Sequence, residues 1–159
     1  MTMVSPSKQY RINIDSALLA FSVLCKLGAG KVDTFANRLK SQKIQYLAQV
    51  FGVSPAYNFS LYIHGPYSPD LAHDLFTFNG ANQSPDMSDF VPDVLKERFK
   101  KLSEFIKGKT LKQLELITTL HFLKRLSYSS DEARKKLKEW KRASLDEVNE
   151  SFAELKKIP

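Results

Sequence analysis

The chain has 159 residues and a net charge of +7, and its 43% share of apolar residues is that of a globular protein, which excludes a disordered chain. Its length predicts one domain over residues 1–159, large enough to fold without a disulfide or a metal. The first fifteen residues contain no apolar core of a signal peptide, and the first apolar run, residues 17–27, is too short to span a bilayer, so we expect a cytoplasmic protein that makes no use of a membrane.

The apolar run predicts the first helix, capped by Asp15 or Ser16 and ended by Gly28. Apolar residues lie nearly all round this segment, which is typical of a central, buried helix. Cys25 lies in the run and is the one cysteine of the chain. We therefore expect a buried structural thiol rather than a reactive one, in a reducing compartment.

A second helix is predicted from a cap at Asp33 to about Phe51, where Gly52 stops it. Its apolar residues form one stripe: Phe35, Ala36, Leu39, Tyr46, Leu47 and Val50. Lys43 lies within this stripe, because it is four residues from two of its members and helical neighbours are three or four residues apart.

The hydrophobic period then changes from helical to alternating. Phe59, Leu61 and Ile63 alternate with polar or amphipathic residues, which predicts one short strand or hairpin near residues 57–63. We expect Gly65-Pro66 to break this strand, because glycine adopts unusual dihedral angles and proline cannot continue a regular ladder.

Ser68 is the expected cap of a third helix, with Pro69 at its first position and Asn79-Gly80 at its end. Asp74 lies on the apolar side of this helix, as Lys43 does on the second. Two opposite charges on inward faces predict a structural ion pair between Lys43 and Asp74. The alternative is that Lys43 sends its ammonium to water and Asp74 bonds to backbone.

Residues 80–91 read as a loop, and Pro92 is expected to open a fourth helix that ends before Gly108. Capping boxes then predict three helix starts: Thr110, Ser129 and Ser144. The C-terminal stretch is therefore two helices with a break near Ser144, and we expect Trp140 to be a packing anchor. The predicted fold is mainly α, a compact bundle of about six or seven helices with the one strand or hairpin.

The excess charge lies in the second half of the chain. Residues 1–95 carry seven basic and seven acidic residues, whereas residues 96–159 carry seventeen and ten. A basic segment offers possible contacts to nucleic-acid phosphates, namely Arg134, Lys135, Lys136, Lys138, Lys141 and Arg142. A helix-turn-helix over residues 110–142 would suit this interpretation, and an ordinary solvated face is the alternative.

Motifs of catalysis are absent from the sequence: it has no Gly-rich phosphate loop, no Cys-x-x-Cys, no His-Glu-x-x-His and no Gly-x-Ser-x-Gly. His64 with His73 and Asp74 could begin a metal site, but such sites need three or four converging ligands. We expect no enzyme, no cofactor and no metal, and keep an enzyme of unknown reaction as the last alternative.

The strand, the turn and the proline-started helix follow one another closely, so the turn should project side chains at a sharp corner. The predicted partner-binding residues at this corner are His64, Gly65, Pro66 and Tyr67. The alternative is that the corner only fixes how the strand and the helix pack.

Residues 42–49, Gln-Lys-Ile-Gln-Tyr-Leu-Ala-Gln, resemble the Gln-Lys-Leu-x-Tyr-Leu-x-Gln stretch of the SocA-like, or Panacea, antitoxin domain family and its uncharacterised YwgA-like relatives. Residues 59–71 resemble the aromatic-rich strand, Tyr-Gly-Pro turn and following helix of that family, with His64 where an aromatic residue is expected. The resemblance covers about residues 15–80, and the basic helical part, residues 92–157, departs from it.

The resemblance implies a compact helical domain of a prokaryote without catalytic residues. Some members of the family bind and neutralise a toxin, so it implies a protein-binding module that is antitoxin-like or regulatory, with a toxin as one kind of partner. The binding surface would combine the corner with exposed apolar residues of the C-terminal helices. A nucleic-acid-binding regulator is the alternative.

Overall fold

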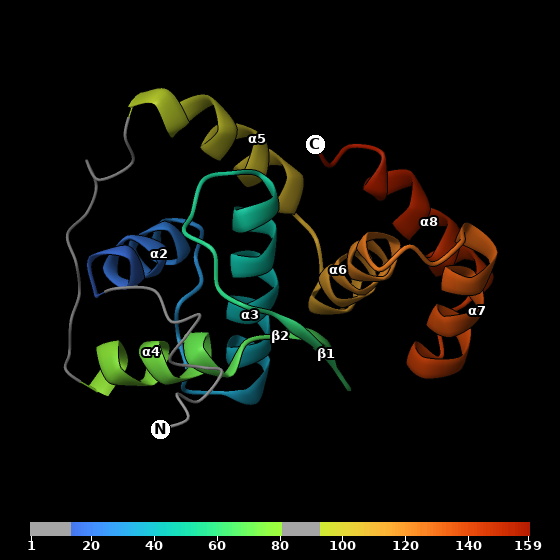
Figure 1. The fold of residues 1–159 in the computed structure, drawn as a ribbon, viewed down its shortest axis with the longest axis horizontal. Coiled ribbons are helices and arrows are strands. Elements are labelled where there is room, and N and C mark those ends of the chain that lie inside the picture. The colour runs from blue at the N-terminus through green and yellow to red at the C-terminus, as the bar shows by residue number, and fades with distance from the viewer. Residues whose placement is uncertain (1–13, 81–92) are drawn as a thin grey trace, which may run out of the picture.

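The computed structural model describes residues 14–80 and 93–159, which form seven α-helices, one short 3-10 helix and a two-stranded hairpin (Figure 1). In chain order the elements are α2 (Ile14–Lys26), α3 (Phe35–Val50), β1 (Ser60–Tyr62), β2 (Gly65–Tyr67), α4 (Pro69–Gly80), η1 (Asp93–Leu95), α5 (Lys96–Ile106), α6 (Leu111–Arg125), α7 (Ser130–Lys141) and α8 (Leu145–Leu155). The mainly helical fold with a short hairpin is confirmed. Apart from Gly80, which ends α4, the predicted loop over residues 80–91 and the helix start at Pro92 lie outside the described residues.

The central helix is α3, and the expectation that the first helix would be central is wrong. Every residue from Ser41 to Ala48 is buried, because α2, α4, α5, α6 and the hairpin all pack against α3 (Figure 1). The run in α2 does contribute to the core, but Cys25 near its end is exposed, so the predicted buried thiol is also wrong. None of the described helices combines the length and apolar composition that a membrane crossing requires.

The start of α3 lies one residue later than the sequence predicts. Thr34, rather than Asp33, is the N-cap, and its hydroxyl accepts a hydrogen bond from the backbone N–H of Asn37 at 3.0 Å. Asp33 instead accepts a bond from the Asn37 side chain at 2.8 Å. Both contacts fix the entry of the chain into α3.

Two apolar clusters meet at α6. Its Leu114 and Ile117 belong to the larger cluster with α2, α3, α4 and α5. The smaller cluster is formed by Leu116, Leu120 and Leu123 of α6 with Ala133, Leu137 and Val148 of α7 and α8. Because the helical repeat places these two sets on different sides, α6 attaches the outer pair α7–α8 to the rest of the molecule.

The break before α8 is confirmed. Thr110 and Ser144 each form a reciprocal capping box, and Ser129 caps α7 by accepting a bond from the backbone N–H of Glu132. Trp140, however, is half exposed, with the Lys136 ammonium 4.5 Å from the centre of its ring. It is therefore not the predicted packing anchor.

The hairpin pairs Ser60 with Tyr67, Leu61 with Pro66 and Tyr62 with Gly65. The strand predicted near residues 57–63 is confirmed, but Gly65-Pro66 is the start of β2 rather than a break. Gly65 has φ +91°, in the region that glycine adopts without strain. Proline is tolerated at Pro66 because its missing N–H would point away from β1.

Candidate functional site

Two glutamines of α3 hold the two ends of the hairpin segment. Gln42 donates to the carbonyl of Ser68 at 2.9 Å and accepts from its N–H at 2.8 Å. Gln49 makes the same pair of bonds with Tyr57, at 3.0 and 2.8 Å. A side-chain amide presents a donor beside an acceptor, as a neighbouring strand does, so each glutamine takes the place of one residue of such a strand.

Lys43 lies between these two glutamines in the sequence and is 0% exposed. Its ammonium donates to the carbonyl oxygen of Pro66 at 2.9 Å. Burial lowers the pKa of Lys43 from 10.5 to about 8; the nearby Glu115 opposes this shift and Lys141 adds to it. The sequence correctly places Lys43 on the inward face of α3.

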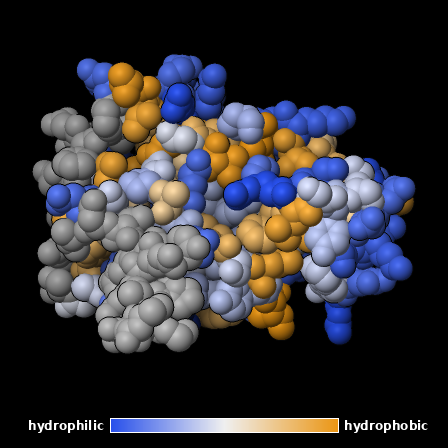
Figure 2. Space-filling view, in the orientation of Figure 1, coloured by the Kyte–Doolittle hydropathy of each residue, from blue (hydrophilic) through white to orange (hydrophobic). Residues whose placement is uncertain are grey.

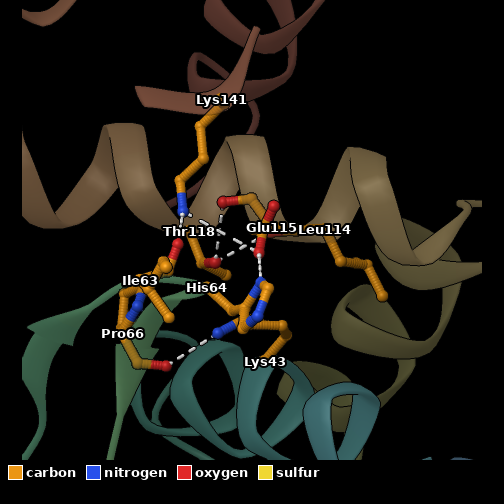
Figure 3. A network of polar contacts seen from close by, with 8 residues as sticks. All are labelled: Lys43, Ile63, His64, Pro66, Leu114, Glu115, Thr118 and Lys141. Atoms are coloured by element: carbon orange, nitrogen blue, oxygen red, sulfur yellow. Dashed lines mark hydrogen bonds and ion pairs between the residues drawn. The ribbon is translucent and has the colours of Figure 1, made fainter. Parts of the chain in front are cut away.

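A second lysine reaches the same hairpin from the other side (Figure 3). The ammonium of Lys141, on α7, donates to the carbonyl of Ile63 at 2.6 Å and lies 3.8 Å from Glu115 Oε1. His64 Nδ1 lies 3.3 Å from that same oxygen. Burial lowers the pKa of Lys141, and Glu115 opposes the shift. The hairpin is thus held by Lys43 of α3 at β2 and by Lys141 of α7 at the turn, with Glu115 of α6 near both.

Lys43 and Asp74 are both buried, as expected, but they do not pair with each other. Lys43 bonds to the Pro66 carbonyl, and Asp74 Oδ2 accepts a hydrogen bond from the Tyr57 hydroxyl at 2.8 Å. The predicted ion pair is wrong because helical periodicity locates inward charges but does not reveal the backbone carbonyls and hydroxyls that the hairpin brings to them.

The predicted partner-binding corner is turned partly inward. Gly65 and Pro66 are buried and Tyr67 is partly buried, so Gly65 and Pro66 cannot meet a partner directly. The apolar exposure lies one step earlier: Ile63 is 84% exposed and Tyr62 is about half exposed. The exposed Phe35 meets the ring of His64 edge-on at 5.3 Å.

We call Phe35, Tyr62, Ile63 and His64 the hairpin tip surface. Figure 2 shows hydrophobic residues gathered over the hairpin as far as its tip at the lower edge of the view. Sequence reasoning missed Tyr62 and Ile63 because the alternation places Ile63 on the buried side of a strand, whereas the strand ends at Tyr62 and Ile63 opens the turn.

Only part of the predicted basic segment is available to an external ligand. Lys141 is held at the hairpin, Arg134 stacks 4.1 Å from the centre of the Phe152 ring, and Lys136 lies over two aromatic rings. Lys135, Lys138 and Arg142 are exposed, and in the described part of the chain they have no hydrogen-bond or ion-pair partner. The nucleic-acid surface on α7 therefore shrinks from six predicted residues to three.

The three histidines have different surroundings and do not form one site. His64 faces Glu115, His73 is exposed on α4, and His121 Nδ1 lies 2.7 Å from the Tyr46 hydroxyl. Burial lowers the pKa of His121, and Arg125 lowers it further. Among residues 14–80 and 93–159, no three histidine, cysteine or acidic side chains gather into a possible metal site.

A pocket of about 280 Å³ opens between the residues before β1 and the end of α6. It is lined by Gln49, Ala56, Tyr57, Asn58, Phe59, Phe122, Arg125 and Leu126. The Tyr46 ring supports two of its walls, since it packs 5.4 Å from the ring centre of Phe59 and 6.3 Å from that of Phe122. The pocket therefore combines aromatic walls at Phe59 and Phe122 with a largely polar lining that includes Gln49, Asn58 and the cationic Arg125.

No protein-family model, curated protein or solved structure matches the chain. The resemblance to the Panacea family therefore stays a prediction drawn from residues 42–49 and 59–71. These two segments contain Gln42, Lys43 and Pro66, which the structure brings together at the base of the hairpin.

Proposed function

We propose that this protein is a non-catalytic protein-binding module and that its contact surface is the hairpin tip surface. One observation carries the proposal: Ile63 is 84% exposed at the end of a hairpin whose backbone is fixed from two sides. A clustered group of exposed aromatic and aliphatic residues is typical of protein interfaces, whereas single exposed apolar residues need no explanation.

The bonds beneath the tip support this function. Lys43 and Lys141 hold the carbonyls of Pro66 and Ile63, and Gln42 holds the exit of the hairpin at Ser68. A surface that is already fixed in its bound shape loses little conformational entropy on association. The polar network therefore serves the apolar tip by presenting it in one conformation.

A lysine of lowered pKa is also a feature of Schiff-base enzymes. Lys43 does not suit that chemistry, because it is 0% exposed and its ammonium donates to Pro66. The antitoxin resemblance favours a protein partner instead, a toxin or another regulatory target in a prokaryotic cytoplasm. The motif residues Gln42 and Lys43 would then be retained for the support that they give to the hairpin.

The test is a comparison of two exposed positions in the full chain. A photo-crosslinking phenylalanine derivative placed at Ile63 should capture a defined protein in the cells that produce this chain. The matched control is Val94, which is 82% exposed on η1 and is not part of the tip. Ile63→Asp should abolish co-purification of the captured protein, and Val94→Asp should leave it unchanged. Equal capture at both positions, or co-purification that survives Ile63→Asp, would contradict the proposal.

A further inference from the structure

The two outer edges of the hairpin differ in chemistry. Residue pairs in an antiparallel ladder alternate between hydrogen-bonded and non-hydrogen-bonded pairs. Because Pro66 has no N–H to donate, its pair with Leu61 is the non-hydrogen-bonded one. The N–H and C=O of Leu61 therefore point away from β2, and the carbonyl of Pro66 points away from β1.

The outer edge of β2 is already occupied. The carbonyl of Pro66 accepts a hydrogen bond from the ammonium of Lys43. The backbone N–H and C=O of Ser68 both bond to the side chain of Gln42. Side chains of α3 thus complete the hydrogen bonding that a third strand would provide on this side.

The outer edge of β1 is open. In the part of the chain that the structure describes, the backbone N–H and C=O of Leu61 make no hydrogen bond. β2 packs against α3 and α6, whereas β1 packs on β2. Natural proteins protect such edges with charged side chains or proline, and the exposed side chains of β1, Ser60 and Tyr62, provide neither.

The pocket described above begins beside this edge. Phe59, two residues before Leu61, lines it together with Phe122 and Leu126. Arg125, which is exposed and lines this pocket, places positive charge at one end of the edge. A chain lying along β1 would therefore find backbone partners at Leu61, a pocket with aromatic walls at Phe59 and Phe122, and one exposed cation, Arg125, that favours acidic residues.

We propose that β1 binds an extended segment of the partner protein as a third strand, with one side chain of that segment in the pocket against Phe59 and Phe122 and an acidic side chain near Arg125. The proposal rests on the proposed function and specifies the form of the partner. A second copy of this chain is disfavoured as the occupant, because two chains that each have a net charge of +7 repel each other.

The probe is a phage-displayed library of linear dodecapeptides selected on the full chain. Enriched peptides should alternate apolar residues and contain Asp or Glu. The amide of Leu61 should exchange with solvent at least about tenfold more slowly in the peptide complex than in the free protein, since strand addition engages that N–H. This measurement needs no variant and is unaffected by folding defects.

Two variants of Leu61 separate the backbone from the side chain. Leu61→Pro removes the outward N–H and should weaken peptide binding by about tenfold, the effect of one lost hydrogen bond. Leu61→Ala loses side-chain contacts but retains the N–H, and should bind within about threefold of the parent. Thermal unfolding confirms that both variants are folded.

Failure of strand addition is distinct from failure of the proposed function. If bound peptides leave the exchange of Leu61 unchanged, or bind Leu61→Pro as tightly as the parent, or if no peptide is enriched, strand addition is wrong, whatever the crosslinking at Ile63 shows. A dimer of this chain that Leu61→Pro dissociates in sedimentation experiments would also overturn it, by making a second copy the occupant.

Discussion

The ammonium of Lys141 lies 2.6 Å from the carbonyl oxygen of Ile63, and this bond joins the last turn of α7 to the hairpin turn, 78 residues away in the sequence. Lys141 is one of six basic residues in a segment that reads as a uniform charged face. In the structure, some residues of that face bond to other parts of the fold and the others are exposed to solvent. Substitutions in the two groups should therefore affect stability differently.

Lys141→Met should release the hairpin turn from α7. Loss of a hydrogen bond from a charged donor costs about 1.5 to 3 kcal/mol of stability, and amides of the turn should exchange faster in hydrogen-exchange experiments. Lys138→Met, an exposed substitution on the same helix, is the control and should change stability by less than about 0.5 kcal/mol. Equal effects of the two substitutions would show that the bond does not stabilise the turn.

Gly65→Ala should lower the free energy of unfolding more than Gly108→Ala does. Both glycines have positive φ, +91° and +77°, so both substitutions carry backbone strain of about 1 kcal/mol. A Cβ at Gly65 would also lie 2.8 Å from Thr119 Oγ1 and 3.2 Å from Lys43 Nζ, whereas a Cβ at Gly108 has no neighbour within 4 Å. We expect about 3 kcal/mol of destabilisation at Gly65 in urea unfolding. A similar loss at both positions would contradict this close packing.

Lys43 should make stability depend on pH in an alkaline window. Below pH 8 its ammonium is charged in both folded and unfolded chains, and the cost of burial is fully present. Between about pH 8 and 10.5 the unfolded chain holds more protons than the folded chain, so the free energy of unfolding rises with pH. The shift corresponds to a rise of up to about 3 kcal/mol.

The measurement compares parent and Lys43→Met by urea unfolding at the two ends of that window. As the pH rises, the free energy of unfolding of the parent should increase relative to that of Lys43→Met, because methionine does not titrate. Lys101→Met, at an exposed position on α5, is the control and should follow the parent. A constant difference between parent and Lys43→Met would mean that Lys43 has an ordinary pKa.

Ser144→Ala should destabilise α8 by about 1 kcal/mol. The substitution removes the hydroxyl that accepts the backbone N–H of Glu147 at 3.1 Å and so disrupts the reciprocal capping box. Ser103→Ala, at an exposed position inside α5, should be neutral or slightly stabilising, because alanine is the better helix former. Chemical denaturation of both variants provides the measurement, and a neutral result at Ser144 would show that the cap is not needed.

The nucleic-acid alternative makes a different prediction for α7. If α7 binds phosphates, replacing Lys135, Lys138 and Arg142 with glutamine should weaken binding and flatten its salt dependence, since fewer counterions are released. Replacing Arg134 and Lys136, which stack on aromatic rings, should affect binding much less. The absence of a gel shift by the parent protein at low salt would exclude this alternative.

Several helix starts are predictable because their signals are local, although α2 begins at Ile14, before its predicted caps Asp15 and Ser16. Ser68, Thr110 and Ser144 all cap helices as their sequence patterns predict. The choice of central helix was wrong for a physical reason. Residues 17–27 are more apolar than α3, but α3 buries its glutamines and Lys43 by bonding them to the hairpin.

The candidate site was predictable only in outline. Periodicity located Lys43 and Asp74 on inward faces, and turn residues located the corner. Periodicity cannot show that the Lys43 ammonium meets the carbonyl of Pro66, because that contact depends on how a segment 23 residues away is placed. Nor can composition show which of six neighbouring cations is buried, since Lys141 differs from Lys138 only in the face of α7 on which it lies.

Because α6 belongs to both apolar clusters, it determines which helices of this fold can be replaced in related chains. One side of α6 packs into the core around α3, and the other side packs against α7 and α8. A related chain could exchange that outer pair for a different covering layer and still keep the hairpin supports of α3 intact. It would have to supply anew the single cation that Lys141 provides at Ile63. Sequence divergence concentrated after α6 is therefore compatible with a retained hairpin, and the position equivalent to Lys141 is where a compensating basic residue should be sought.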